Sequence, residues 1–189
     1  MKRKILSCVA CFLIVSIMRA LPQEAKPAPP QGMPAAAGVY YLKGPGKWIK
    51  LDPAFVDESK MHGLGAYMQT EGLIGLSLNY AYLGISAPLQ LSEPRPVFYV
   101  RGVGSAQEVQ LVRLSPGKEN RTVRTSSTEV SVGNKGGFKR SEIRQVATVV
   151  FSDGSFSVTP EQDLKSGEYL VALGSAMKGF DFGITAGRR

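Results

Sequence analysis

The sequence predicts an all-β protein, an antiparallel β-sandwich with an N-terminal β-hairpin subdomain. Two observations favour this fold class. The 189 residues include 21 Gly and 12 Pro. These residues are typical of turns, and they divide the chain into many short segments. After residue 94, seven short segments carry apolar and β-branched residues, several of them in strict alternation, and no helical period occurs there. Because 43% of the residues are hydrophobic, the chain can form a substantial core.

The N-terminus has the pattern of a secretory signal peptide. A basic stretch, residues 1–4, precedes the apolar run from Ile5 to Met18. A membrane-spanning helix needs about 20 apolar residues, so this run is short for one. We therefore predict a signal peptide over residues 1–20, cleaved between 20 and 25, and an uncleaved N-terminal anchor is the alternative.

Cleavage of this segment would change the composition of the chain that remains. Cys8 and Cys11 are the only cysteines, and both lie in the apolar run, so no disulfide can stabilise the exported domain. Four of the 23 basic residues also lie before position 21, which leaves 19 against 15 acidic residues and a net charge of about +4. This mild charge suits an acidic glycan or a membrane surface, and export argues against nucleic acid as a partner.

The first part of the exported chain divides into a linker and a hairpin. Residues 21–37 hold five prolines among Ala, Gln and Lys, which predicts a Pro/Ala-rich disordered linker. Two apolar runs, Val39–Leu42 and Lys47–Leu51, flank Gly44-Pro45-Gly46 and predict a β-hairpin. Residues 54–74 fit no single pattern, and a short helix capped by Asp52 is one option.

The later strands follow at regular spacing. Leu76–Tyr82 alternates between apolar and polar residues, and Ser92–Pro96 marks a boundary between a hairpin-rich part, residues 38–93, and a sandwich, residues 94–189, which we expect to share a core. Asp153-Gly154 predicts a tight hairpin turn. The seven expected strands are Val97–Arg101, Val109–Leu114, Thr122–Ser126, Val146–Ser152, Ser155–Thr159, Glu168–Leu173 and Phe180–Ala186. Residues 127–145, between the third and the fourth, form a basic, Gly-rich loop.

The segment around Leu164, Gly167 and Tyr169 resembles the tyrosine corner of immunoglobulin-like sandwiches, in which a tyrosine hydroxyl bonds to an upstream backbone group. The absence of a cysteine pair excludes a true immunoglobulin domain.

A second resemblance covers most of the exported chain. The opening Tyr40-Tyr41-Leu42 with Trp48 and Leu51, together with the C-terminal Leu164, Gly167-Glu168-Tyr169 and Phe180-Asp181-Phe182-Gly183, resembles a group of uncharacterised small exported bacterial proteins. This likeness implies a bacterial envelope setting and supplies no catalytic residues.

Two groups of side chains are candidates for binding. Arg121, Arg124, Lys139 and Arg140 would form an anion-binding patch if they converge on one edge; otherwise they serve solubility and protect sheet edges. Trp48, Tyr80 and Tyr82 would form an aromatic contact surface if they are exposed. The alternative for these aromatics is burial, with Trp48 as the central packing residue.

Most catalytic chemistries lack their residues. His62 is the only histidine and the exported part has no cysteine, so the usual zinc and copper sites are excluded, and we predict no metal or cofactor. No Gly-x-Ser-x-Gly motif accompanies His62, which argues against a Ser-His enzyme. Glu168 and Asp181 are the one carboxylate pair that could meet on adjacent strands.

We therefore predict an exported, non-catalytic binding module of the bacterial envelope, periplasmic or secreted, whose partner is an envelope glycan or protein. Membrane contact is expected only if the signal segment is retained as an anchor. The first alternative is a structural accessory of an envelope assembly that acts through a β-edge contact. The second and least favoured is a small carboxylate-dependent hydrolase.

Overall fold

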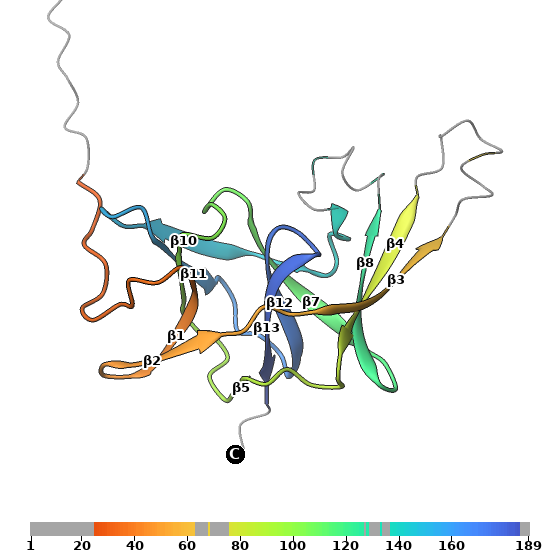
Figure 1. Cartoon of the computed structure of the whole chain (residues 1–189), viewed down its shortest axis with the longest axis horizontal. Helices are drawn as coiled ribbons and strands as arrows, with labels where there is room; N and C mark the ends of the chain where they lie inside the picture. Colours follow the sequence, from red (N-terminus) through yellow and green to blue (C-terminus); the bar gives the residue numbers. More distant parts are fainter. Residues whose placement is uncertain are drawn as a thin grey trace, which may run out of the picture.

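The computed structural model describes residues 25–62, 76–126 and 137–185, together with positions 68, 128 and 133; for residues 58–62 it describes the backbone alone. Every regular element in these ranges is a strand, and the strands form two sheets (Figure 1). The predicted all-β, sandwich-like fold is therefore confirmed. The signal segment lies outside the described residues, and its prediction stays a prediction.

The smaller sheet has five strands in the order β10-β11-β6-β1-β2, and every pairing in it is antiparallel. Its members are β1 (Gly38–Gly44), β2 (Lys47–Leu51), β6 (Phe98–Arg101), β10 (Val146–Val150) and β11 (Phe156–Pro160). The two hairpins expected from the Gly44-Pro45-Gly46 and Asp153-Gly154 turns are β1-β2 and β10-β11. Gly154 adopts a positive φ of 80°, which is the reason a glycine is required at that turn.

The larger sheet runs in the order β3-β4-β8-β7-β12-β13-β5, and the short β9 pairs with β7 beside this path. Its members are β3 (Val56–His62), β4 (Ser77–Leu83), β5 (Gln90–Leu91), β7 (Val109–Pro116), β8 (Asn120–Ser126), β9 (Ile143–Arg144), β12 (Gly167–Ser175) and β13 (Lys178–Ile184). β8 pairs with β7 only at Ser115 and Pro116, because β9 occupies that edge at Leu111 and Val112.

Strand β12 lies between two hydrophobic clusters. Tyr169, Val171 and Leu173 face the small sheet, in a cluster that includes Phe98 and Val158. Leu170 and Ala172 face the opposite way, into a second cluster with Tyr82 and Val123 from β4 and β8. Burial on both faces explains the unbroken apolar run of β12.

Both sheets contain strands from before and from after residue 93. In the small sheet β1 pairs with β6, and in the larger one β4 pairs with β8. Residues of both parts, such as Val39 and Val171, belong to the same core cluster. The part of the chain before residue 93 therefore contributes strands to both layers.

Two segments differ from expectation. Residues 25–37 are an irregular but placed segment in which Pro27 O accepts a hydrogen bond from Ser152 N at 2.8 Å, whereas we expected a disordered linker. Residues 56–62 form the strand β3, because β4 offers them an antiparallel partner from Val56 to His62. Within the described ranges, no helix is long and apolar enough to cross a membrane.

Candidate functional site

The loop before β12 is locked by Tyr169. Its hydroxyl donates to Lys165 O at 2.7 Å, and its ring stacks on Phe182 at 5.6 Å. Tyr169 and Leu164 are buried, and Leu164 N donates to Pro94 O at 2.8 Å. Gly167 has a φ of 150°, and the Arg113 guanidinium lies 3.2 Å from the point where a Cβ would stand. This is the hydrogen bond expected of a tyrosine corner.

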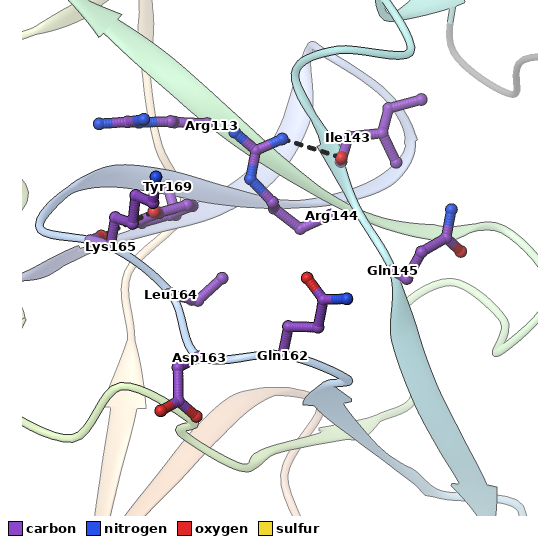
Figure 2. Close-up of a pocket in the computed structure, with 9 residues that line it drawn as sticks. All are labelled: Arg113, Ile143, Arg144, Gln145, Gln162, Asp163, Leu164, Lys165 and Tyr169. Carbon is purple, nitrogen blue, oxygen red and sulfur yellow. Dashed lines mark hydrogen bonds between the residues drawn. The ribbon is translucent and has the colours of Figure 1, made fainter.

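A pocket of about 390 Å³ opens beside this corner (Figure 2). Three cationic side chains reach it from three separate segments: Arg113 from β7, Arg144 from β9 and Lys165 from the corner loop. The described residues that line it are Arg113, Ile143, Arg144, Gln145, Gln162, Asp163, Leu164, Lys165 and Tyr169. Among them Asp163 is the single acid, and its carboxylate lies 3.8 Å from Arg95, which offsets part of its charge. The pocket is therefore positive overall.

Backbone carbonyls hold the two guanidinium groups. Arg144 Nη1 donates to Ser141 O at 2.8 Å and to Ile143 O at 3.0 Å, the second of which is drawn in Figure 2. Arg113 Nη2 donates to Ser166 O at 3.2 Å. Within the described residues, neither guanidinium forms an ion pair with a carboxylate. Because each guanidinium has five N–H donors, donors remain for an anion.

The two guanidinium groups also affect the pKa of Tyr169. Burial raises the pKa of its hydroxyl, and the nearby charges of Arg113 and Arg144 oppose this rise. Both cations therefore act on the hydroxyl that closes the corner, at the wall of the pocket. An anion in the pocket would be attracted by the same two charges.

A second hollow, of about 490 Å³, lies against the same segment and shares Ile143, Arg144 and Gln145 with the first. Gln107, Gln110 and Arg140 also line it. Arg144 thus borders two adjoining hollows whose polar groups are mostly amides and guanidiniums. Such groups bind the hydroxyls and carboxylates of sugars by hydrogen bonds.

Arg121, the first residue of the predicted basic patch, is not available to a ligand. Its side chain is 2% exposed and forms an ion pair with Asp181, and its Nη1 lies 3.5 Å from Glu168 Oε2. Its Nε donates to Gly84 O at 3.0 Å and its Nη2 to Leu83 O at 2.6 Å. Arg121 therefore joins β8 to β12, β13 and the loop after β4, and the predicted role in anion binding is wrong for it.

The other three predicted cations lie around different groups. Arg124 is exposed and donates to Ser77 Oγ at 3.0 Å. Burial raises the pKa of Glu142, and the charges of Lys139, Arg124 and Arg144 lower it, so these three cations lie near an acid. Arg140 lines the second hollow. The four residues do not form one patch, and the positive pocket is built instead from Arg113, Arg144 and Lys165.

The aromatic residues also separate. Tyr82 is 1% exposed and donates its hydroxyl to Ala176 O at 2.5 Å, and Tyr80 packs against the same second cluster. Trp48 lies half-buried on the other sheet, outside both core clusters. Trp48, Tyr80 and Tyr82 therefore form no common surface, and Trp48 is not the central packing residue.

Glu168 and Asp181 do approach each other, but through Arg121. Glu168 Oε2 accepts from Ala87 N at 2.7 Å and Glu168 Oε1 from Gln90 Nε2 at 3.1 Å. The pair thus forms part of a hydrogen-bonded structural network rather than an open catalytic dyad. No group of three or more metal-ligating side chains occurs among the residues that the structure describes.

Comparison with known proteins adds no relative. A scan against protein-family models and searches of curated proteins and of solved structures found no match for this chain.

Proposed function

We propose that this protein is an exported, non-catalytic binding module of the bacterial envelope, and that it binds an acidic glycan in the pocket beside the tyrosine corner. The observation that supports the proposal is the convergence of Arg113, Arg144 and Lys165 on one pocket of about 390 Å³. Arginine guanidiniums match the geometry of carboxylates and can bond them through two parallel N–H groups.

The arginine side chains of the pocket are also preorganised for binding. Backbone carbonyls of Ser141, Ile143 and Ser166 hold the guanidiniums in place, so little side-chain entropy remains to be lost on binding. Gln145 and Gln162 add amide donors and acceptors suited to sugar hydroxyls. Figure 2 shows Gln162 directed from the segment after β11 toward Arg144.

The test is a calorimetric titration with a carboxylated oligosaccharide, an oligogalacturonate, and with its neutral methyl ester. The proposal expects binding of the acid form that weakens as salt rises. Arg144→Gln should weaken it about tenfold or more, since a hydrogen bond to a charged group contributes about 1.5–3 kcal/mol. Arg124→Gln is the matched control, because Arg124 is exposed and lies outside the pocket lining.

Three outcomes would contradict the proposal: no binding of the acid, equal binding of the neutral ester, or equal losses in the Arg144 and Arg124 variants. Inorganic phosphate in a parallel titration tests whether the pocket takes any small anion. Phosphate binding with no oligogalacturonate binding would reject the glycan.

A second candidate function, a β-edge contact with an envelope partner, is favoured by strand β10. It is an edge strand with no charged residue, Val146-Ala147-Thr148-Val149-Val150, and Val149 is 46% exposed. The bonds from Phe151 N to Ser155 O and from Glu161 N to Gln145 O direct the odd-numbered residues toward β11. The N–H and C=O groups of Val146, Thr148 and Val150 therefore point outward, where another strand could pair.

Sedimentation velocity across a concentration series, with and without envelope extract, tests this candidate. Val149→Lys should abolish any association that the parent protein shows, because a charge on an edge strand opposes pairing. Association that survives this substitution would remove the β10 edge from consideration.

A further inference from the structure

The outer face of the small sheet carries a cluster of aromatic side chains that the proposed function does not use. Tyr40, Trp48 and Tyr99 come from β1, β2 and β6, and Phe151 follows β10. The Trp48 ring meets Tyr99 edge-on at 5.1 Å and Tyr40 at 6.5 Å. Tyr99 stacks on Phe151 at 6.3 Å. We call these four residues the aromatic face.

The proline-rich residues 25–37, which we call the leader, lie against this face. Tyr40 Oη donates to Ala36 O at 2.8 Å, and a Cβ at Gly32 would lie 3.7 Å from Trp48 Nε1. At its start, the leader accepts a hydrogen bond from Ser152 N through Pro27 O. Tyr40 and Phe151 do not belong to the core cluster between the sheets. Their exposed fractions are nevertheless only 3% and 7%.

The fit between leader and aromatic face is incomplete at its centre. Trp48 Nε1 is buried and has no hydrogen-bond partner among the described residues, although an indole N–H normally finds one when buried. The leader turns away from an extended path at this point, since Met33 N donates to Pro30 O and Gly32 has a φ of 72°. A segment that stayed extended would carry a backbone carbonyl past Trp48.

An aromatic surface that carries an indole N–H donor suits polyproline segments. These segments are extended before they bind, so they lose little entropy, and their backbone carbonyls are free to accept hydrogen bonds. Proline rings pack on aromatic faces, and the leader contains four prolines, Pro27, Pro29, Pro30 and Pro34, of which the last three are half-buried.

We propose that the aromatic face is a docking surface for an extended, proline-rich segment of a partner protein, and that the leader is its resident occupant, which the partner displaces. Trp48 Nε1 donates to a carbonyl of the incoming segment. The surface is distinct from the pocket of Arg113, Arg144 and Lys165, with which it shares no residue. This inference therefore does not depend on the proposed glycan binding.

The test uses the full chain and a fluorescein-labelled peptide of ten prolines, followed by fluorescence anisotropy. The matched control peptide has alanine at every second position. Because Trp48 is the only tryptophan of the chain, its own emission independently reports occupancy of the aromatic face. The decaproline should bind, shift the emission of Trp48 and outcompete the control peptide.

Two variants distinguish an effect on docking from an effect on folding. Pro29→Ala with Pro30→Ala weakens the leader, and binding should tighten by about tenfold, since apparent affinity scales with the fraction of molecules whose site is open. Trp48→Phe keeps an aromatic ring but removes the N–H together with part of the ring area, and binding should weaken several-fold with an unchanged circular dichroism spectrum. Arg144→Gln is the control and should bind decaproline as the parent does.

The proposal is overturned if decaproline fails to bind the Pro29/Pro30 variant, or if the alanine-containing peptide binds equally well. It is also overturned if Trp48→Phe, still folded, binds as tightly as the parent. Should Trp48→Phe lose its fold, Tyr99→Leu takes its place, with the same expected loss of binding.

Discussion

Removing the hydroxyl of Tyr169 tests the corner that borders the candidate pocket. Tyr169→Phe deletes the bond to Lys165 O and leaves the stacking on Phe182 in place. A net intramolecular hydrogen bond contributes about 1 kcal/mol. Tyr169 and Lys165 both line an open pocket, so water can reach the freed carbonyl and the loss should stay near this value. In a domain of this size, the melting temperature should fall by about 2–4 °C.

Tyr82→Phe provides the comparison. Tyr82 is also 1% exposed, but its hydroxyl bonds to Ala176 O inside the second cluster, and burial raises its pKa strongly. Its freed carbonyl belongs to Ala176, which is 2% exposed, whereas Lys165 is exposed, so the loss should approach the full desolvation cost of about 1–3 kcal/mol. Tyr169→Phe should therefore destabilise less than Tyr82→Phe.

Urea unfolding, followed by the emission of Trp48, measures both variants. A change for Tyr169→Phe within about 0.5 kcal/mol of zero, as for an ordinary surface substitution, would mean that the corner bond does not stabilise the fold. A larger loss for Tyr169→Phe than for Tyr82→Phe would refute the argument from water access.

Three further changes have defined outcomes. Arg121→Met leaves the buried carboxylate of Asp181 and the half-buried one of Glu168 without their cation and should cost about 3–5 kcal/mol in urea unfolding. Burial raises the pKa of Glu142 above 4.5, so the folded state binds this proton more tightly than the unfolded state does. The stabilisation that the bound proton gives is therefore lost as the pH rises through the pKa of the folded state. Glu142→Gln should therefore be more stable than the parent at neutral pH, and melting curves should show the difference shrinking toward pH 4.5. Gly154→Ala should cost about 1–2 kcal/mol by thermal melting: its Cβ would meet nothing within 4 Å, so the strain of the positive φ is the only term.

Local patterns predicted most of the strands and the corner, because both depend on residues close together in the sequence, but they missed β3 and β9. The Tyr169 hydroxyl reaches only four residues back, to Lys165. The burial of Arg121 depends on Asp181, sixty residues later, and on carbonyls 37 and 38 residues earlier, so nothing near it in the sequence indicates that it is buried.

The positive pocket and the leader were missed for the same reason. Arg113 reaches the corner because β7 pairs with β12 in a register that places it opposite Tyr169, and that register is long-range. The composition of residues 25–37 indicates that they cannot form a core of their own. Their placement depends on an aromatic face that exists only after β1, β2 and β6 have paired.

The position of β12 also governs when the chain can fold. Among the described residues, β12 and β13, residues 167–184, are the last strands, yet β12 lies between the two hydrophobic clusters and pairs with β7 and β13. Neither cluster can close until these residues have emerged from the ribosome, so a partly synthesised chain lacks both cores. Contacts of such long range also slow folding. Neither core can therefore be completed before residues 167–184 have been synthesised.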